Sequence, residues 1–193
     1  GGCARLASVS IPDSVTSIGG HAFSGCSMLR SVAIPGNVTS IGKSLFYYCD
    51  RLKNISMPDN VLIMAVEKSA FSGCGGLTNI TIPNGATSIG DNAFDGCTGL
   101  TSVSIPDSVT SIGAYAFASC IRLPEITIPN SVTSIGMYAF KNCPEFTNIT
   151  LPSSVTSIGY GAIEKCRNIT NIAIPNSVTS INGWAFSGCT GLA

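Results

Sequence analysis

The chain has 193 residues, of which 45% are hydrophobic and only 10% are charged, and its ten acidic and ten basic side chains balance. A neutral chain has no net field that would attract nucleic acid or an anionic membrane surface, and no apolar run reaches the roughly 18 residues that a membrane span requires. The length is sufficient for one well-buried domain. We therefore expect a folded protein without a nucleic-acid partner and without a membrane-inserted segment.

A repeat of 23 residues runs through the whole chain. Nine cysteines follow it, with a single interval of 25 residues: Cys3, Cys26, Cys49, Cys74, Cys97, Cys120, Cys143, Cys166 and Cys189. A period of about 20–29 residues with Leu, Ile and Val at fixed places is typical of a leucine-rich-repeat solenoid. The spacing predicts one solenoid domain over residues 1–193, with about eight full units. Because the chain begins without Met and both ends fall within a unit, we expect it to be a segment of a longer array.

Each unit contains the same elements in the same order, as in residues 100–120, LTSVSIPDSVTSIGAYAFASC. The segment LTSVSI predicts a short strand, which Pro106 ends because it lacks a backbone donor. The segment SVTSI predicts a second, shorter extended piece, and Gly113 then turns the chain. The segment AYAF predicts one helical turn that buries Ala116 and Phe117.

The glycine that follows the second extended piece predicts a left-handed backbone. We expect positive φ at Gly113, and at Asn182 in the last unit, because Gly and Asn tolerate this conformation best. Stacked units would place neighbouring strands about 4.8 Å apart, in a parallel β-sheet on the concave face. The predicted fold is an α/β repeat solenoid, mostly β, in which each unit buries its apolar face only against its neighbours.

The pattern LxxVxIPxSVTSIGxxAFxGC resembles the BspA-like (Treponema-type) leucine-rich repeats of bacterial and protist surface proteins, and the resemblance covers the whole chain. It implies a curved solenoid in a secreted or cell-surface protein, with a role in adhesion to host proteins or to other microbes. The family has no catalytic residues or cofactors to carry over. The resemblance therefore implies a class of function, the binding of an extracellular partner, without indicating which one.

The cysteines predict a buried ladder of reduced thiols. They share one register in which a small apolar side chain is needed, and a free thiol behaves as a small hydrophobe with a weak donor. Disulfides between adjacent units are the alternative, since stacking would bring Cα atoms within bridging range. Zinc is disfavoured because the spacing is never of the CxxC kind and His21, in a variable surface slot, is the only histidine. We expect no enzymatic activity, no metal and no cofactor.

Three surfaces are candidates for partner binding, because residues one period apart stack in columns. The first is the strand face, whose outward columns are small and polar apart from a basic corner formed by Arg30 and Lys53. Solenoids commonly bind partners on their concave surface, but this face has few of the Trp, Tyr and Arg side chains that anchor interfaces. A solvated sheet without a partner is the alternative.

The second surface is the edge of the predicted helical turns, where large aromatic residues gather in the last four units: Tyr115, Tyr138, Tyr160 and Trp184. Stacking predicts that Tyr115 lies beside Tyr138, with Tyr160 and Trp184 close by. Clustered surface aromatics favour an interface, and simple shielding of the coil edge is the alternative.

The third surface is the 25-residue unit, MPDNVLIMAVEKSAF, in which Leu62 and Ile63 stand where other units are polar. We place its two-residue insertion at Val66–Glu67. Exposed apolar patches often mark contacts, and insertions in repeat proteins lie in loops on one face. A locally repacked bulge is the alternative.

The leading functional hypothesis is a non-catalytic, protein-binding module of an adhesin whose partner is an extracellular or host-surface protein. A structural role is the alternative, because uncapped ends expose apolar units and open strand edges, through which copies could stack end to end into dimers or fibres. A remote alternative is ice binding through the column of threonines from Thr16 to Thr179.

Overall fold

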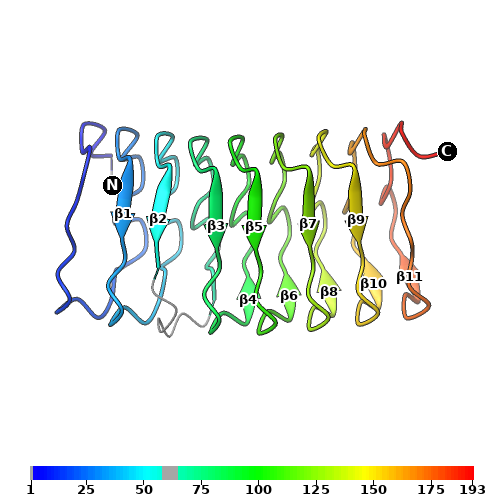
Figure 1. Cartoon of the computed structure of the whole chain (residues 1–193), viewed down its shortest axis with the longest axis horizontal. Coiled ribbons are helices and arrows are strands. Elements are labelled where there is room, and N and C mark those ends of the chain that lie inside the picture. The colour runs from blue at the N-terminus through cyan, green and yellow to red at the C-terminus, as the bar shows by residue number, and fades with distance from the viewer. Residues whose placement is uncertain (1, 58–64) are drawn as a thin grey trace.

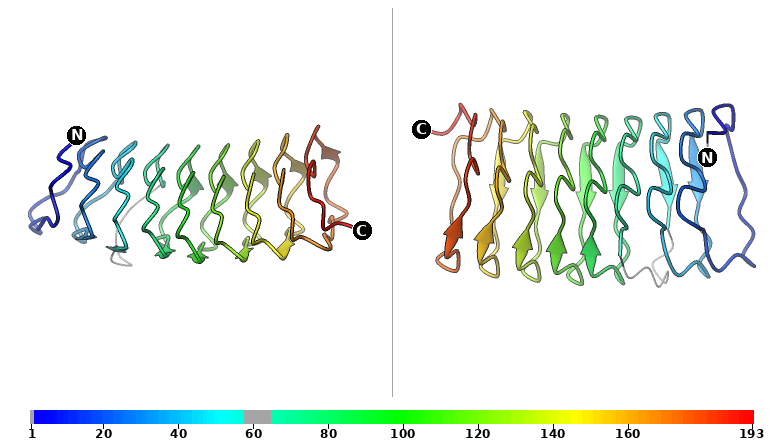
Figure 2. Two further views of the ribbon diagram at one scale, coloured as in Figure 1. Left: turned by 90° about the horizontal axis from the view of Figure 1, so that it is seen from above. Right: turned by 180° about the vertical axis from the view of Figure 1, so that it is seen from behind.

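The computed structural model describes residues 2–57 and 65–193, which form a β-solenoid (Figure 1). Successive repeats lie side by side as the rungs of a nearly straight row, with the two ends of the chain at opposite ends of the row (Figures 1 and 2). In these residues every regular element is a short β-strand, and no segment forms even a single helical turn. The described part of the chain therefore contains no helix long and apolar enough to cross a bilayer. The predicted repeat solenoid is confirmed, whereas the predicted helical turns are wrong.

The first strand of each unit belongs to one row of the solenoid, the strand row. These strands are β1 (Ser31–Ala33), β2 (Asn54–Ser56), β3 (Asn79–Thr81), β5 (Ser102–Ser104), β7 (Glu125–Thr127) and β9 (Asn148–Thr150). The central residue of each strand faces the core and its two neighbours are exposed, as period-two alternation predicts. The pairs are parallel and lie one repeat apart, but they are separate couples, β1 with β2, β3 with β5 and β7 with β9.

A second row, the Ser-Ile row, forms the longest sheet. Its strands are β4 (Ser88–Ile89), β6 (Ser111–Ile112), β8 (Ser134–Ile135), β10 (Ser157–Ile158) and β11 (Ser180–Ile181). They pair in parallel in the spatial order β11-β10-β8-β6-β4. Isolated bridges continue the ladder from Ile89 through Val66 and Ile41 to Ile18. The continuous sheet therefore follows the SVTSI segments.

The segments predicted as helical turns form a third row, the turn row, which comprises residues 113–120 and their equivalents. Within a rung, tight turns are closed by bonds such as that from the Ala93 N–H to the Gly90 carbonyl, at 3.2 Å. Between rungs, every second N–H donates to a carbonyl of the next rung: Asn92 to Ala114, Phe94 to Ala116 and Gly96 to Ala118, at 2.8, 2.8 and 2.9 Å. A helix would direct these N–H groups along its own axis. The bonds between rungs explain why the segment is not helical.

Gly113 has a role different from the one predicted. Positive φ occurs instead at two other positions of the rung, represented by Tyr115 and Ser119, each with φ of 56°. A Cβ at Gly113 would lie 2.6 Å from the backbone nitrogen of Asp91 and 2.7 Å from the carbonyl carbon of Gly90, in the preceding rung. The prediction of a left-handed backbone at Gly113 and Asn182 is therefore wrong. Glycine is needed at position 113 because adjacent backbones approach closely there.

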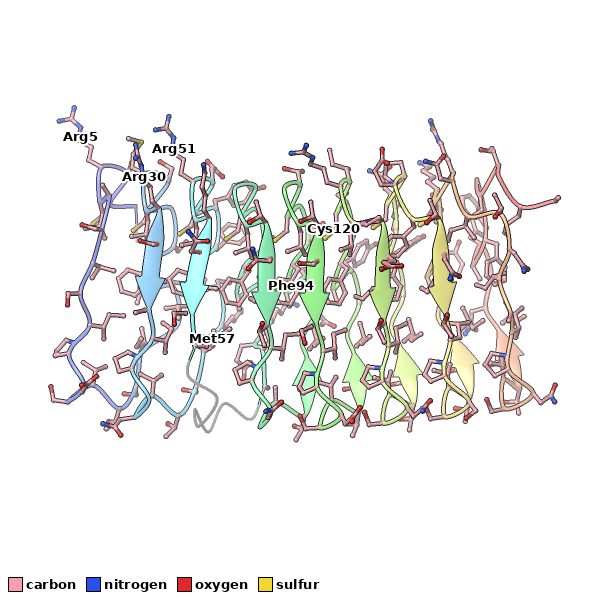
Figure 3. All side chains as sticks on the ribbon, in the orientation of Figure 1. Arg5, Arg30, Arg51, Met57, Phe94 and Cys120 are labelled. Atoms are coloured by element: carbon pink, nitrogen blue, oxygen red, sulfur yellow. The ribbon has the colours of Figure 1, made fainter. Side chains whose placement is uncertain are left out.

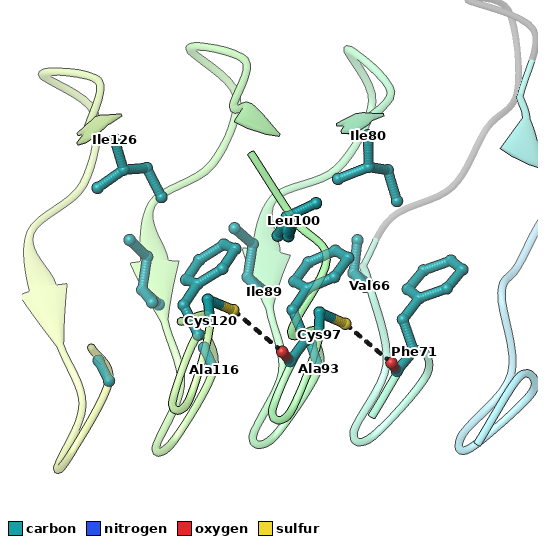
Figure 4. Packing of buried hydrophobic residues seen from close by; sticks show 14 of the residues in the cluster. Val66, Phe71, Ile80, Ile89, Ala93, Cys97, Leu100, Ala116, Cys120 and Ile126 are labelled. Carbon is teal, nitrogen blue, oxygen red and sulfur yellow. Dashed lines mark hydrogen bonds between the residues drawn. The ribbon is translucent and has the colours of Figure 1, made fainter. Parts of the chain in front are cut away.

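Two ladders of side chains fill the core beneath the turn row. Phenylalanine rings stack from Phe23 to Phe140 with centroids 5.1–5.7 Å apart. Beside them, the Cys97 thiol donates to the Phe71 carbonyl at 3.1 Å, and the same contact to the preceding rung recurs from Cys49 to Cys189 (Figure 4). The cysteines from residue 26 onward are buried, as predicted, with free thiols, whereas the prediction of a buried thiol is wrong for Cys3, which is exposed in the first rung. Each thiol thus combines small apolar volume with a donor for a buried carbonyl.

The 25-residue unit keeps its register on both sides of residues 58–64. Ser56 pairs with Ala33, and Val66 bridges Ile41 and Ile89, so the two additional residues lie between Ser56 and Val66. The predicted insertion at Val66–Glu67 is therefore wrong, because Val66 is a buried member of the Ser-Ile row. Leu62 and Ile63, proposed as an apolar contact, lie outside the described residues.

Candidate functional site

The aromatic residues of the last four rungs form one cluster along the turn row, the aromatic row, in which Tyr115 and Tyr138 are half-buried and Tyr160 and Trp184 are exposed. Their consecutive ring centroids are 5.0, 5.5 and 6.2 Å apart. The predicted proximity of Tyr115 to Tyr138, with Tyr160 and Trp184 close by, is confirmed. Trp184 is 62% exposed and Tyr160 is 37% exposed. The row therefore offers solvent a run of aromatic faces with polar tips.

Three of these rings stand on a backbone that is unfavourable for large side chains. Tyr115, Tyr138 and Trp184 have φ of 56°, 55° and 63°, which lie in the left-handed region that Asn and Gly tolerate better. Equivalent rungs carry Asn92 and Gly161 at this position. Because the fold imposes this φ in every rung, an aromatic residue costs more backbone energy here than Asn or Gly would. Folding alone does not explain why aromatics occupy these positions.

Tyr160 enters the row from the preceding position of its rung. The register position itself is occupied by Gly161, with φ of 58°. A Cβ on Gly161 would collide with the ring of Tyr138. The glycine thus makes room for the edge-to-face contact between Tyr138 and Tyr160, whose planes are inclined by 83°.

A charged cluster lies beside the middle of the aromatic row. The Lys141 ammonium is 4.4 Å from the centroid of the Tyr138 ring, within cation–π range, and 3.2 Å from Oε2 of the buried Glu164. Lys165 Nζ lies 3.6 Å from the other carboxylate oxygen. Oε2 makes no hydrogen bond in spite of its short distance from Lys141, so this contact is ionic without hydrogen-bond alignment. Desolvation, followed by the nearby Tyr160 and Glu164, raises the pKa of Tyr138.

The predicted basic corner is a recess at the start of β1 and β2. Arg30 and Lys53 line it together with Arg51, and its volume is about 580 Å³. The exposed Ser31 and Asn54 add polar groups to the lining. Sequence reasoning missed Arg51 because it lies in the turn before the strand, outside the columns of strand residues.

The residues that could carry metal or thiol chemistry lie apart in the described part of the chain. His21 is exposed, as expected. In residues 2–57 and 65–193, no group of three or more His, Cys, Asp or Glu side chains could hold a metal ion. Burial raises the pKa of the Cys49 thiol to about 12. Such a thiol is a poor nucleophile at neutral pH, because the thiolate is the reactive form.

The threonine column has a structural explanation. The Thr110 and Thr133 hydroxyls donate to the carbonyls of Thr87 and Thr110 in the preceding rungs, at 3.1 and 3.3 Å. The neighbouring Ser131 hydroxyl donates to the Val109 carbonyl at 2.6 Å. These bonds connect rungs, so regular hydroxyl spacing follows from stacking. Ice binding through this column stays a prediction, which a thermal-hysteresis measurement tests.

The stacked rungs, their parallel pairing and their variable outward columns define a leucine-rich-repeat solenoid. The family model of the BspA type leucine rich repeat region matches residues 1–67 and 64–193, in six copies, slightly fewer than the eight units that the cysteine spacing predicts. The chain belongs to this family of BspA type leucine-rich-repeat proteins. Membership supports a repeat module for protein interaction.

Solved structures of similar chains come from several bacteria. A leucine-rich repeat protein from Bacteroides ovatus has a TM-score of 0.67 and 30% identity, over 92% of this chain and 57% of that one. The Treponema pallidum leucine-rich repeat protein TpLRR has a TM-score of 0.64 and 32% identity, over 93% and 72% of the two chains. This chain thus spans little more than half of the Bacteroides protein. No curated protein sequence matches it.

A more distant structure shares the fold alone. The pneumococcal vaccine antigen PcpA has a TM-score of 0.51 and 16% identity, over 89% of this chain and 58% of that one. The solenoid is therefore retained while most side chains change.

Proposed function

We propose that this chain is a non-catalytic, protein-binding module of a secreted or cell-surface protein, and that the aromatic row contacts an extracellular partner. The observation that carries the proposal is the aromatic row itself, with Tyr115, Tyr138 and Trp184 on left-handed backbone positions. Tyr and Trp are the residues that most often anchor interfaces. Membership of the BspA type family supports both the binding role and the surface location.

The dimensions of the aromatic row fit one segment of a partner. Four rungs at a spacing of about 4.8 Å give a row about 15 Å long. Tyr and Trp supply large contact area at low conformational-entropy cost, and their polar tips donate hydrogen bonds. Lys141 beside Tyr138 adds one positive charge to this surface. We therefore expect the partner to present an apolar segment with hydrogen-bond acceptors at its border.

Asparagine substitutions separate binding from folding. Tyr138→Asn and Trp184→Asn remove a ring but suit the left-handed backbone, so we expect unchanged or higher free energies of unfolding. Binding to a partner selected from a panel of purified extracellular proteins should weaken about tenfold or more, as for anchor residues of interfaces. Biolayer interferometry measures the binding and urea denaturation the stability.

Tyr48→Asn is the matched control for both substitutions. Tyr48 also has positive φ, 54°, and is 53% exposed, but it lies outside the aromatic row. Its variant should bind the partner as tightly as the parent. Equal affinities of the parent and of both row variants would refute the assignment of the aromatic row.

A further inference from the structure

We propose that the recess around Arg30, Arg51 and Lys53 is a second binding site, which holds a short acidic peptide segment. The site rests on the proposed function in one respect, since its ligand is part of a protein partner. It shares no residue with the aromatic row and lies in rungs at the other end of the solenoid. The two assignments are therefore open to separate tests.

The neutral chain is divided into oppositely charged parts. Residues 1–57 contain five basic and two acidic side chains, and residues 58–193 contain five basic and eight acidic ones. The net charges of the two parts are therefore +3 and −3. Arg5, Arg30 and Arg51 project from one edge at the positive end (Figure 3). Long-range attraction of an anionic group is concentrated at that end.

Among residues 2–57 and 65–193, no carboxylate forms an ion pair with the cations of the recess. The ion pairs of the described residues are Lys68 with Asp91, and Lys141 and Lys165 with Glu164. The three basic residues of the recess are in none of them, although Asp50 also lines the recess. Each of these cations is exposed and available to an anion from outside.

The position of Arg30 opposite Lys53 is unfavourable without a ligand. Ser31 pairs with Asn54, so the residues before them lie on adjacent rungs, and the Lys53 N–H donates to the Arg30 carbonyl at 2.9 Å. Like charges directly opposite each other on neighbouring strands destabilise the sheet. Other rungs have an uncharged threonine at this position: Thr78, Thr101, Thr147 and Thr170. The paired cations are thus not a requirement of the fold.

The shape of the recess accommodates side chains of a peptide. Its volume of about 580 Å³ falls within the range of about 300–1,000 Å³ that is common for binding pockets. Gly76 also lines the recess, and a Cβ there would lie 2.7 Å from the Asp50 carbonyl oxygen, so the backbones of the two rungs approach closely at this point. Arginine binds a carboxylate with two parallel hydrogen bonds, and arginine clusters recognise acidic peptide motifs. Ser31 and Asn54 are placed to hydrogen-bond a peptide backbone.

The lining favours a peptide over other polyanions. No aromatic side chain is among the residues that line the recess, whereas proteins that bind single-stranded nucleic acid rely on aromatic stacking. A sugar ring would likewise find no aromatic face. Three cations and two small polar residues suit carboxylates joined by a polar backbone.

Binding of a fluorescein-labelled hexaglutamate peptide, measured by fluorescence anisotropy, tests the proposal. The double variant Arg30→Gln/Lys53→Gln should bind about tenfold more weakly, since each exposed ion pair is worth up to about fivefold. Asp50→Asn should bind more tightly, by about twofold, because it removes a competing carboxylate. Affinity should also fall steeply between about 0.01 M and about 1 M salt, as the Debye length decreases from about 30 to about 3 Å.

Arg122→Gln is the matched control, because Arg122 is an exposed arginine in the same column as Arg51 but three rungs away. It should bind the peptide as the parent does, and so should Trp184→Asn, whose loss of partner binding belongs to the aromatic row alone. An equal loss for Arg122→Gln and for the double variant would overturn the proposal. Tighter binding of a sulfated polysaccharide or of single-stranded DNA of the same charge would overturn the assignment to a peptide.

Discussion

The turn row and the strand row repeat equally regularly, yet they contribute differently to the solenoid. In the turn row, each rung is bonded to the next, for example from the Phe71 N–H to the Ala93 carbonyl and from the Phe94 N–H to the Ala116 carbonyl, both at 2.8 Å. In the strand row, the described strands pair in separate couples. The segments without regular secondary structure therefore connect the rungs more continuously than the strands do.

This difference shows where the chain can vary. The interior of the turn row needs glycine for close approach, phenylalanine for stacking and cysteine as a small donor. Its outward positions have no such requirement, and the aromatic row occupies four of them. The basic recess lies where the strand row begins. Both candidate sites are therefore variations at exposed positions on a nearly constant interior, and four predictions test how much stability each row supplies.

The largest expected effect is alkaline unfolding of the turn row. Burial raises the pKa of six thiols of this row: Cys26, Cys49, Cys74, Cys97, Cys120 and Cys189. For Cys49 it raises the pKa to about 12. The unfolded chain loses these protons near pH 8.5, so between that pH and the raised values the unfolded state binds fewer protons and stability falls as pH rises. Each fully buried thiol costs about 1.4 kcal/mol per pH unit in this window. Guanidinium denaturation under reducing conditions from pH 7 to pH 10 measures the loss.

Serine variants identify the thiols as the cause. Cys49→Ser retains a donor for the Phe23 carbonyl but does not ionise, so its stability should fall less steeply with pH. A free energy of unfolding that is constant between pH 8 and pH 10 would contradict this account.

The second effect compares side chains buried in the two rows. Phe94→Ala removes a fully buried ring from the middle of the ladder and should cost about 3–5 kcal/mol. Val103→Ala, at the half-buried centre of β5, should cost about 1 kcal/mol. Urea denaturation followed by circular dichroism compares them. Equal costs would mean that the strand row contributes as much packing energy as the turn row.

The third effect separates two reasons for glycine in the turn row. Gly113→Ala places a Cβ against the backbone of the preceding rung and should cost about 1–3 kcal/mol, as overpacking does. Gly96→Ala meets nothing closer than 3.8 Å but has φ of 71°, so its cost should be about 1 kcal/mol. Melting temperatures of the two variants decide between the reasons. A larger loss for Gly96→Ala would mean that backbone conformation matters more than close approach.

The smallest effect concerns two hydroxyls that lie just before strands of the Ser-Ile row, the exposed one of Thr110 and the part-buried one of Ser131. Thr110→Val removes the hydroxyl bond to the Thr87 carbonyl, but the Thr110 N–H still donates to that carbonyl at 2.9 Å, so the free energy of unfolding should change by about 0.5 kcal/mol or less. Ser131→Ala breaks a part-buried bond of 2.6 Å to the Val109 carbonyl and should cost about 1 kcal/mol. Chemical denaturation of both variants makes the comparison, and a cost for Thr110→Val above that of Ser131→Ala would contradict it.

The sequence predicts which side chains of a candidate site are neighbours wherever those side chains lie one repeat apart and stack directly on each other. Tyr115 and Tyr138 are one period apart, so their contact follows from the repeat length. The left-handed backbone beneath them was not predictable, because hydrogen bonds between rungs impose it and aromatic residues do not favour it. Arg51 joins the recess from a turn whose path no strand alternation indicates. The position of the insertion was likewise decided by the pairing of Val66 with Ile41 and Ile89.

The sequence by itself determined the period, the buried columns and the stacking of equivalent residues, because a unit that cannot bury its apolar face alone must stack on its copies. Only the tertiary structure decided that the Ser-Ile segments form the continuous sheet, that Gly113 permits close approach and that each thiol from Cys49 onward donates to the preceding rung. The physical reason is that periodicity specifies which residues are neighbours. Dihedral angles and hydrogen-bond partners depend instead on the distance and orientation at which one backbone meets the next.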